Sequence, residues 1–384
     1  MPAREKLFAA AERLHNYLLA RHYDAGLLRG PDAGVRFNLR AWRFLKSAFS
    51  FLPWRDDYVF IQTQGYWILS NWMLHEATGS ARWRTVALES TEATLRLQRA
   101  DGTWAYPLPE RKHLIATVEG NWGAIGFLAS YARQPEQRYL EGAVRWYDYL
   151  VGRIGFQPHE SGKAINYFDK PRGKVPNNSV EAAWVFARMW RATGDERYLE
   201  HLDGMEDFLR SVQLSTGELP YVVESPYERR REHYLCYQYN AFQFLKLAWL
   251  NRLRPSETVA AILHGLANFL ASGVTASGAS AEDCFSRRVE VDYYTAALAA
   301  ALDEAERLKL VDGRLAESAY NRVTARQKHD GSFIYSRGDY GFLHDSRSYP
   351  RPMAMTLFHL LYGAGAGDGF ANLQSRALAR QMPI

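Results

Sequence analysis

The sequence predicts an all-α protein in which six helical hairpins form two concentric rings, an (α/α)6 toroid. Three observations support this fold class. Segments that are apolar on nearly every side alternate with amphipathic segments, the pair recurs about every 55–60 residues, and near-identical short connections join three of the pairs. A helix that is apolar all round belongs in the interior, whereas an amphipathic helix belongs at the surface.

The expected helices follow one another in pairs along the chain. The inner helices begin near Gln62, Thr117, Asn177, Tyr234, Glu290 and Tyr349. The outer helices cover residues 4–22, 82–99, 136–151, 196–213, 256–271 and 313–328. The similar connections read ATGSARW at 77–83, RQPEQRYL at 133–140 and ATGDERYL at 192–199. An open solenoid of helix pairs is the alternative, but solenoids usually have shorter repeats and polar end caps.

The hairpin at residues 174–223 illustrates how each repeat is built. The turn at 176–179 carries helix-capping residues, and apolar residues then recur at helical spacing as far as Trp190. Residues 193–195 end this helix, and an amphipathic helix follows. A hairpin of about 45 residues is too thin to bury its apolar faces alone, so it should stack against copies of itself.

The repeat covers nearly the whole chain, so we expect residues 1–384 to form one domain. Residues 24–55 interrupt the repeat as an irregular segment with a short helix near 40–50, whose apolar side chains could cover one end of the barrel as a lid. The alternative is an interaction surface that docks on a membrane, because basic residues lie beside the apolar ones. These basic residues are Arg40, Arg43 and Lys46.

Composition excludes several classes of function. The chain is mildly basic, with a formal net charge of +5, but no lysine-rich arm indicates nucleic-acid binding. Two cysteines, Cys236 and Cys284, are too few for a disulfide framework or a cysteine-rich zinc site. The N-terminus lacks a basic-then-apolar leader, and no apolar run is long enough to span a bilayer. We therefore expect a cytoplasmic protein without stable membrane insertion; its oligomeric state stays open.

A short motif follows every second outer helix. It reads QRADGTW at 98–104, QLSTGEL at 213–219 and QKHDGSF at 327–333. The glutamine can cap the end of the outer helix, Asp-Gly can make the turn, and the aromatic residue can pack on the neighbouring hairpin. The complete copy at 98–104 resembles the QxxDGxW repeat of terpenoid cyclases, and related helix ends occur in carbohydrate-active α/α toroids. We interpret the motif as structural.

Polar residues are concentrated just ahead of each expected inner helix and in its first turns. With alternating helix directions, all inner N-termini emerge on one face of the barrel, so these residues would converge on a single funnel. Polar caps at a wet barrel mouth are the alternative explanation. The residues expected to bind substrate are Asp57, Gln64, Trp67, His113, Glu119, Trp122, Asn177, Asn178, Tyr237, Arg288, His344, Arg347, Tyr349 and Arg351.

Further residues of the same segments are expected to carry catalysis. They are Tyr239, His233, Glu181, Asp292 and Tyr293. A tyrosine beside a histidine, as in EHYLCYQYN at 232–240, can move a proton next to a carboxylate when neighbouring cations lower the tyrosine pKa. Arginines of the last two segments could supply that charge and hold the substrate carboxylate. Alternatively, two of Glu119, Glu181 and Asp292 would form the carboxylate pair of a glycoside hydrolase.

The chain resembles, in its architecture and hairpin connections, the α/α-toroid superfamily of six-hairpin glycosidases, polysaccharide lyases and glucuronyl epimerases. It also resembles toroid proteins of bacterial exopolysaccharide biosynthesis clusters. The resemblance implies an enzyme that acts on a polysaccharide or oligosaccharide, in particular a uronate-containing one. The implied chemistry is that of a lyase, a C5-epimerase or a glycoside hydrolase.

Two other functions stay open. A terpenoid cyclase or prenyltransferase acting on an isoprenoid would explain the QxxDGxW motif. However, the acidic DxDD and DDxxD motifs are absent, and Asp283-Cys284 matches a prenyltransferase zinc site poorly. A non-catalytic toroid could bind a glycan or a protein through the same aromatic residues, although binding alone does not require histidine, tyrosine and acids together.

The expected mechanism is proton transfer at a uronate. Arginines neutralise the uronate, Tyr239 or His233 removes or returns its C5 proton, and Glu181 or Asp292 orients the sugar. No cofactor and no metal is expected. A calcium site among Asp56, Asp57 and Asp345 is the alternative.

Overall fold

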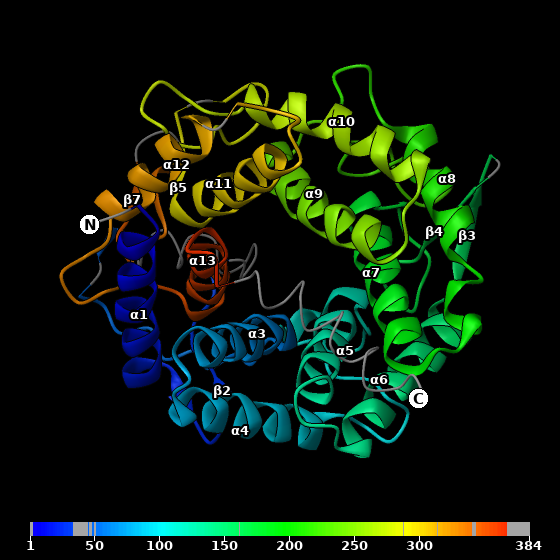
Figure 1. The fold of residues 1–384 in the computed structure, drawn as a ribbon, viewed down its shortest axis with the longest axis horizontal. Coiled ribbons are helices and arrows are strands. Elements are labelled where there is room, and N and C mark those ends of the chain that lie inside the picture. Colours follow the sequence, from blue (N-terminus) through cyan, green and yellow to red (C-terminus); the bar gives the residue numbers. More distant parts are fainter. Residues whose placement is uncertain are drawn as a thin grey trace, which may run out of the picture.

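The computed structural model describes residues 3–33, 45, 48–49, 51–160, 162–286, 288–312, 314–339 and 343–366. Its helices form two concentric rings around one centre, as Figure 1 shows. The all-α class and the (α/α)6 toroid predicted from the sequence are therefore confirmed.

The inner ring consists of the apolar helices. They are α3 (Ile61–Thr78), α5 (Thr117–Tyr131), α7 (Pro176–Thr193), α9 (Cys236–Leu253), α11 (Asp292–Arg307) and α13 (Pro350–Gly363). Each helix contacts the next in this order, and α13 contacts α3, so that the ring closes. Side chains on all sides of these helices are buried, which explains why the amphipathic pattern is weak in α3, α5 and α9.

The outer ring covers the inner ring with amphipathic helices. They are α1 (Ala3–Arg21), α4 (Ala81–Leu97), α6 (Gln137–Tyr149), α8 (Leu202–Val212), α10 (Glu257–Ala271) and α12 (Arg314–Ala325). The first helix of the chain, α1, packs against α13 and completes the last hairpin. Small residues allow the two rings to approach closely: a Cβ added at Gly120 of α5 would lie 2.2 Å from the Trp146 ring of α6.

Two predicted helix bounds differ from the structure. The fourth inner helix begins at Cys236, because Leu235 adopts a left-handed conformation with a φ of 46°. The outer helix predicted at 196–213 is divided into a 3-10 turn, η4 (Glu196–Leu199), and α8. The remaining predicted helices agree with the structure to within a few residues.

Each QxxDGxW copy connects one outer helix to the next, and we call these connections joints. The Gln98 side-chain amide donates to the carbonyl oxygens of Gly102 (3.0 Å) and of Gly142 in α6 (2.9 Å). Gln213 and Gln327 make the equivalent bonds to α10 and α1. The glycine of each copy has a φ of about 90°, and a Cβ there would meet the backbone of the next outer helix. The motif is structural, as interpreted, and its last copy closes the outer ring.

Short strands, which the sequence did not predict, lie in the connections. They are β1 (Tyr23–Asp24), β2 (Leu27–Leu28), β3 (Phe156–His159), β4 (Gly162–Ile165), β5 (Glu290–Val291), β6 (Ser336–Asp339) and β7 (Leu343–Asp345). Strands β5, β6 and β7 form an antiparallel sheet that joins the connections before α11 and α13. Two further turns, η2 (Pro109–Arg111) and η3 (Leu150–Ile154), precede α5 and follow α6.

The segment at 24–55 is held at its C-terminal end. Arg347 donates hydrogen bonds to the carbonyl oxygens of Phe49 (3.3 Å) and Leu52 (2.6 Å), and its guanidinium lies over the Trp54 ring. These contacts attach the segment to the connection before α13. The short helix predicted near 40–50 falls largely, and Arg40, Arg43 and Lys46 fall entirely, outside the described residues.

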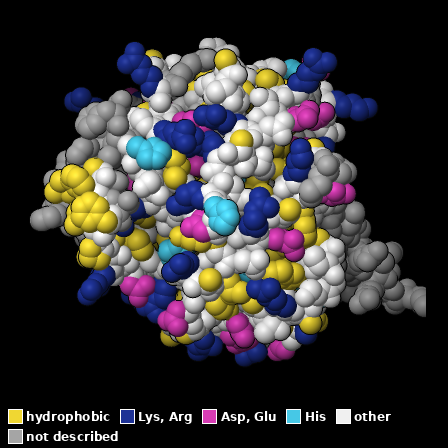
Figure 2. Space-filling model, turned by 90° about the vertical axis from the view of Figure 1, so that its left-hand side faces the viewer, with side chains coloured by type: hydrophobic (Ala, Val, Ile, Leu, Met, Phe, Trp, Pro, Cys, Tyr) yellow, Lys and Arg dark blue, Asp and Glu magenta, His cyan; other side chains and the backbone are white. Residues whose placement is uncertain are grey.

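The surface near α1 and β7 carries charges of both signs. Figure 2 shows lysine and arginine side chains interspersed with aspartate, glutamate and uncharged side chains on this face. A continuous basic surface, such as nucleic-acid binding requires, is not seen on the described part of this face. Within the described residues, none of the helices combines the length and apolarity that a membrane crossing requires.

Candidate functional site

A cavity of about 630 Å³ opens among the first turns of the inner helices and the connections that precede them. Its floor includes residues of α3, α5, α7, α9, α11 and α13. This is the funnel expected from the alternating helix directions. Its volume suits a ligand of several rings, because small-molecule sites usually measure about 300–1,000 Å³.

Aromatic rings form much of the cavity wall, and most of them are tyrosines. The lining aromatic residues are Phe60, Tyr106, Tyr167, Phe168, Tyr221, Tyr234, Tyr239, Phe242, Tyr293, Tyr294 and Tyr335. Tyr221 links Tyr234 and Tyr239, with ring centroids 4.8 and 5.1 Å apart. Such contacts fix the rings in place and leave their faces and hydroxyl groups as binding surfaces.

Charged side chains of both signs also line the cavity. The acids are Glu119, Glu181, Glu228 and Glu282, and the bases are Arg111, Arg172 and Arg351. Arg351 forms a two-pronged ion pair with Asp32 (2.6 and 2.7 Å), which raises the pKa of Arg351, and its guanidinium lies over the Phe60 ring. Among the described residues, no acid forms an ion pair with Arg111 or Arg172. These two arginines are therefore available to an anionic ligand.

Glu119 links two inner helices at the edge of the cavity. It belongs to the first turn of α5, and its Oε2 accepts hydrogen bonds from the backbone N–H groups of Ile61 (2.5 Å) and Gln62 (3.1 Å) at the start of α3. Burial raises the pKa of Glu119 to about 7, although these bonds and Arg351 act in the opposite direction. A carboxylic acid with this pKa can both donate and accept a proton near neutral pH.

Glu181 lies deeper, in α7, and has a different environment. Its Oε1 accepts hydrogen bonds from Lys246 of α9 and from the Trp122 indole of α5 (3.1 Å). Its Oε2 is buried and has no partner among the described residues. Burial lowers the pKa of Lys246, whereas the charge of Glu181 opposes that change. A carboxylate that borders the cavity and has one oxygen without a described partner is an arrangement that a ligand can complete.

The tyrosines have pKa values above the ordinary value. Burial and neighbouring tyrosines raise the pKa of Tyr239 far above 10, and burial also raises the pKa of Tyr293. The Tyr293 hydroxyl accepts a hydrogen bond from the Gln238 side chain (3.3 Å). Both phenols are therefore protonated at neutral pH, which differs from the lowered tyrosine pKa required by the expected proton abstraction.

The structure brings together only part of the residues expected in the funnel. Those that line the cavity are Glu119, Asn177, Glu181, Tyr239, Tyr293 and Arg351. Several others are buried between helices behind the lining, namely Gln64, Trp67, Trp122, Asn178, Tyr237 and Tyr349. For example, Gln64 binds the backbone of Leu28, and Tyr237 stacks on Phe269 of α10. Their side chains are on the sides of the helices that face neighbouring elements.

The remaining expected residues lie away from the cavity lining. His113, Arg288 and His344 are exposed, Asp57 pairs with Arg29 (2.5 Å), and Arg347 holds the segment at 24–55. Asp292 is buried in an ion pair with Arg326, and burial raises the pKa of Asp292 to about 6.

His233 contacts Glu218 instead of facing Tyr239. Of the acids considered for calcium, Asp57 is paired with Arg29, and Asp345 accepts a hydrogen bond from the Tyr349 hydroxyl (2.9 Å).

The sequence analysis missed several residues of the cavity. Arg111, Arg172, Tyr221 and Tyr335 belong to the long connections, several residues before the helix starts that the analysis considered. Lys246, which holds Glu181 from behind the lining, could have been found, because a lysine inside the largely apolar run FQFLKLAWL should have a buried acidic partner.

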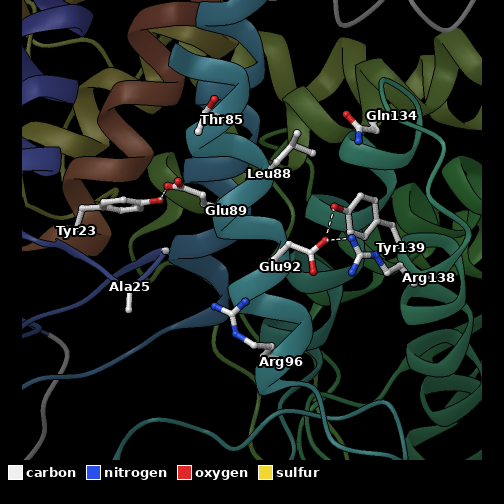
Figure 3. A pocket seen from close by; sticks show the side chains of 11 residues that line it. Tyr23, Ala25, Thr85, Leu88, Glu89, Glu92, Arg96, Gln134, Arg138 and Tyr139 are labelled. Atoms are coloured by element: carbon white, nitrogen blue, oxygen red, sulfur yellow. Dashed lines mark hydrogen bonds and ion pairs between the residues drawn. The ribbon is translucent and has the colours of Figure 1, made fainter. Parts of the chain in front are cut away.

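A second hollow lies on the outer surface between α4 and α6 (Figure 3). Its polar side chains bind one another: the Tyr139 hydroxyl and Arg138 both contact Glu92 (2.6 Å each), and the Tyr23 hydroxyl donates to Glu89 (3.0 Å). This hollow is open and its described polar groups are largely satisfied. The central cavity is the candidate functional site.

Comparisons with known proteins identify the fold. No protein-family model matches the chain, and its sequence matches no curated protein. The structure is similar to cellobiose 2-epimerase from Spirochaeta thermophila, with a TM-score of 0.74 and 12% identity, covering 96% of this chain and 97% of that chain.

Two further solved structures have the same architecture. A glycoside hydrolase of family 76, a mannosidase from Bacteroides thetaiotaomicron, has a TM-score of 0.66 and 11% identity, covering 94% of this chain and all of that chain. A polysaccharide lyase has a TM-score of 0.65 and 11% identity, with full coverage of both chains. The chain therefore has the fold of the α/α toroids to which its sequence was compared.

Proposed function

We propose that this protein is an enzyme acting on an oligosaccharide or polysaccharide in the central cavity. The observation that carries this proposal is the lining, which combines tyrosine rings with carboxylates and arginines in one cavity. Tyrosine offers both an apolar face and a hydroxyl group, as a sugar ring does. The shared fold with an epimerase, a mannosidase and a polysaccharide lyase supports the proposal.

Glu119 and Glu181 are the proposed acid–base pair. Glu119 is the proton donor, because burial raises its pKa to about 7 and a large fraction is protonated at neutral pH. Glu181 is the proposed base, since Lys246 and the Trp122 indole hold its Oε1 and its Oε2 has no described partner. Two carboxyl groups in environments that differ in this way are typical of acid and base roles in one site.

The proposed substrate contains a uronate. Arg111 and Arg172 line the cavity without a described acidic partner and can hold a sugar carboxylate in two-pronged fashion. Arg351 is already ion-paired with Asp32, so in this proposal it affects the substrate only electrostatically and does not bind the carboxylate. The uronate is therefore bound near the connections before α5 and α7.

Tyr239 acts in this proposal as a hydrogen-bond or proton donor. Its raised pKa disfavours the phenolate. Glu181 therefore takes the role of base that the expected mechanism gave to Tyr239 or His233. An isoprenoid is a poorer fit to the same cavity, because four glutamates and three arginines would lose hydration against a hydrocarbon chain.

The test is a product assay with purified protein and defined substrates. One panel contains neutral and uronate-containing oligosaccharides, and a second contains isoprenoid diphosphates. Hydrolysis adds water to the product mass, a lyase creates an unsaturated sugar, and an epimerase exchanges a sugar C–H proton for deuterium without a net mass change in ordinary water. Turnover of an isoprenoid alone would overturn the proposal, as would binding of a sugar without any product.

Paired variants then test the named roles. Arg111→Gln with Arg172→Gln should raise the KM for the uronate substrate at least tenfold and leave that for a neutral analogue unchanged. Tyr239→Phe should lower kcat, whereas Tyr139→Phe, which removes a hydroxyl in the outer hollow, should not. Equal effects of the two tyrosine variants would contradict the assignment of Tyr239.

A further inference from the structure

A cluster of metal-binding residue types lies beside the central cavity, at the start of α9. Ligand atoms of Glu218, His233 and Cys284 all lie within 4.8 Å of one another. The Sγ atom of Cys284 is 3.8 Å from Glu218 Oε2 and 3.4 Å from the Sγ atom of Cys236. The Cys284 thiol, the His233 imidazole and the Glu218 carboxylate therefore lie together, and the Cys236 thiol lies beside that of Cys284.

The surroundings of Glu218 are unusual for an acid. Its side chain is completely buried, and it is in contact with the His233 imidazole. Buried carboxylates are usually paired with a cation or coordinate a metal ion.

We propose that Glu218, His233, Cys236 and Cys284 bind a zinc ion. Zinc bonds of about 2.0–2.3 Å to nitrogen, oxygen and sulfur set tetrahedral ligand atoms about 3.3–3.8 Å apart. The separations of Cys284 from Cys236 (3.4 Å) and from Glu218 (3.8 Å) fall inside this range, and two sulfur ligands would stand at its upper limit of about 3.8 Å. For an ion to enter, the direct contact between His233 and Glu218 has to lengthen, and the Cys236 thiol has to move toward the other three ligands.

Local backbone geometry supports a common site for His233 and Cys236. The left-handed conformation of Leu235 turns the chain between them, immediately before α9 begins. A bulky residue adopts this conformation only where its surroundings enforce it. The ion adds a constraint of this kind, since it holds the side chains on both sides of the turn.

The site has a structural consequence for the cavity. Cys284 belongs to the connection between α10 and α11, which also contributes Glu282 and Val289 to the cavity lining. Four protein ligands leave no open position, as is typical of structural zinc. The ion therefore fixes this connection against the start of α9. This inference replaces the expectation that the protein binds no metal.

The test measures metal content directly. Tag-free protein is reduced, stripped with a chelator, reloaded with zinc, desalted and measured by mass spectrometry of the metal. One equivalent is expected for the wild type and for His264→Ala, which removes an exposed histidine on α10. Cys284→Ser and His233→Ala should each lower the bound zinc at least tenfold.

Cobalt substitution provides a second readout that does not depend on variants. The wild type loaded with Co²⁺ should show the visible bands of a tetrahedral ion and a charge-transfer band from thiolate sulfur. Equal zinc content in the wild type and Cys284→Ser, or a cobalt spectrum without the thiolate band, would overturn the proposal. A disulfide between Cys236 and Cys284 that persists through reduction and excludes metal would overturn it too. None of these readouts involves turnover, so they are independent of the proposed enzyme function.

Discussion

Glu181 and Glu304 are both buried carboxylates on inner helices, but they lie at opposite ends of the barrel. Glu304 is near the C-terminal end of α11, where Arg252 and the Tyr362 hydroxyl (2.5 Å) bind its two oxygens. Glu181 is near the N-terminal end of α7, and only its Oε1 has described partners. Both oxygens of Glu304 therefore have hydrogen-bond partners, whereas only one oxygen of Glu181 has them.

This difference follows from the connections at the two ends. The C-terminal ends of the inner helices enter short connections such as Gly79–Ser80 and Arg254–Ser256, and side chains there pack closely. The N-terminal ends receive long connections, such as 98–116 and 213–235, which separate the helices and leave a cavity. The short connections therefore enclose Glu304 on all sides, whereas Glu181 borders the cavity.

The largest expected effect separates the two carboxylates by activity. Glu181→Gln should lower kcat about 1,000-fold, because it removes the base of the proposed acid–base pair. Glu304→Gln should leave kcat unchanged. The measurement is the initial rate at saturating substrate for protein whose folding is checked by circular dichroism. A Glu181→Gln enzyme with at least half of the wild-type rate would rule out the role of Glu181.

The second prediction concerns Glu119 and pH. Its folded-state pKa of about 7 exceeds the ordinary value of 4.5, so its contribution to stability is fully present below pH 4.5 and is lost as the pH rises through 7. Between pH 4.5 and 7.5, the wild type should lose about 3 kcal/mol of unfolding free energy relative to Glu119→Gln.

Urea unfolding of both proteins at each pH measures this change. Glu141→Gln, which alters an exposed carboxylate of α6, is the matched control and should follow the wild type. Parallel stability curves for the wild type and Glu119→Gln would show that Glu119 does not have the raised pKa.

The third prediction concerns the stability contributed by Glu304, at the C-terminal ends of the inner helices. Glu304→Gln should lower the unfolding free energy by about 2 kcal/mol, because Arg252 loses its charged partner but can turn toward water. Denaturant titration at neutral pH measures the loss. A variant as stable as the wild type would mean that the Arg252–Glu304 pair contributes nothing measurable, and the contrast with Glu181 would then rest on activity alone.

The smallest expected effect concerns the joints of the outer ring. Gln327→Ala removes hydrogen bonds to the Ala10 and Gly331 carbonyl oxygens and should cost about 1 kcal/mol. Gln98→Ala should cost a similar amount. Hydrogen exchange distinguishes them, since only Gln327→Ala should increase exchange in α1, which closes the ring. Increased exchange of α1 in both variants would contradict a local role for each joint.

The sequence by itself determined the hairpins, the two rings and the joints. These features depend on local patterns: apolar periodicity assigns a helix to the inner or outer ring, and Gln-x-x-x-Gly bonds close within five residues. The same patterns predicted that polar residues meet at one mouth, and Glu119, Glu181 and Tyr239 do meet there.

Only the tertiary structure decided which side of each helix start faces the cavity. Asp292 and Tyr293 are neighbours in the chain, yet Asp292 turns to Arg326 and Tyr293 lines the cavity. Their directions depend on the rotation of α11 against its neighbours, which the packing of the whole ring sets. Arg111 and Arg172 reach the cavity through long connections whose paths depend on contacts between distant segments, and no local pattern in the sequence records those contacts.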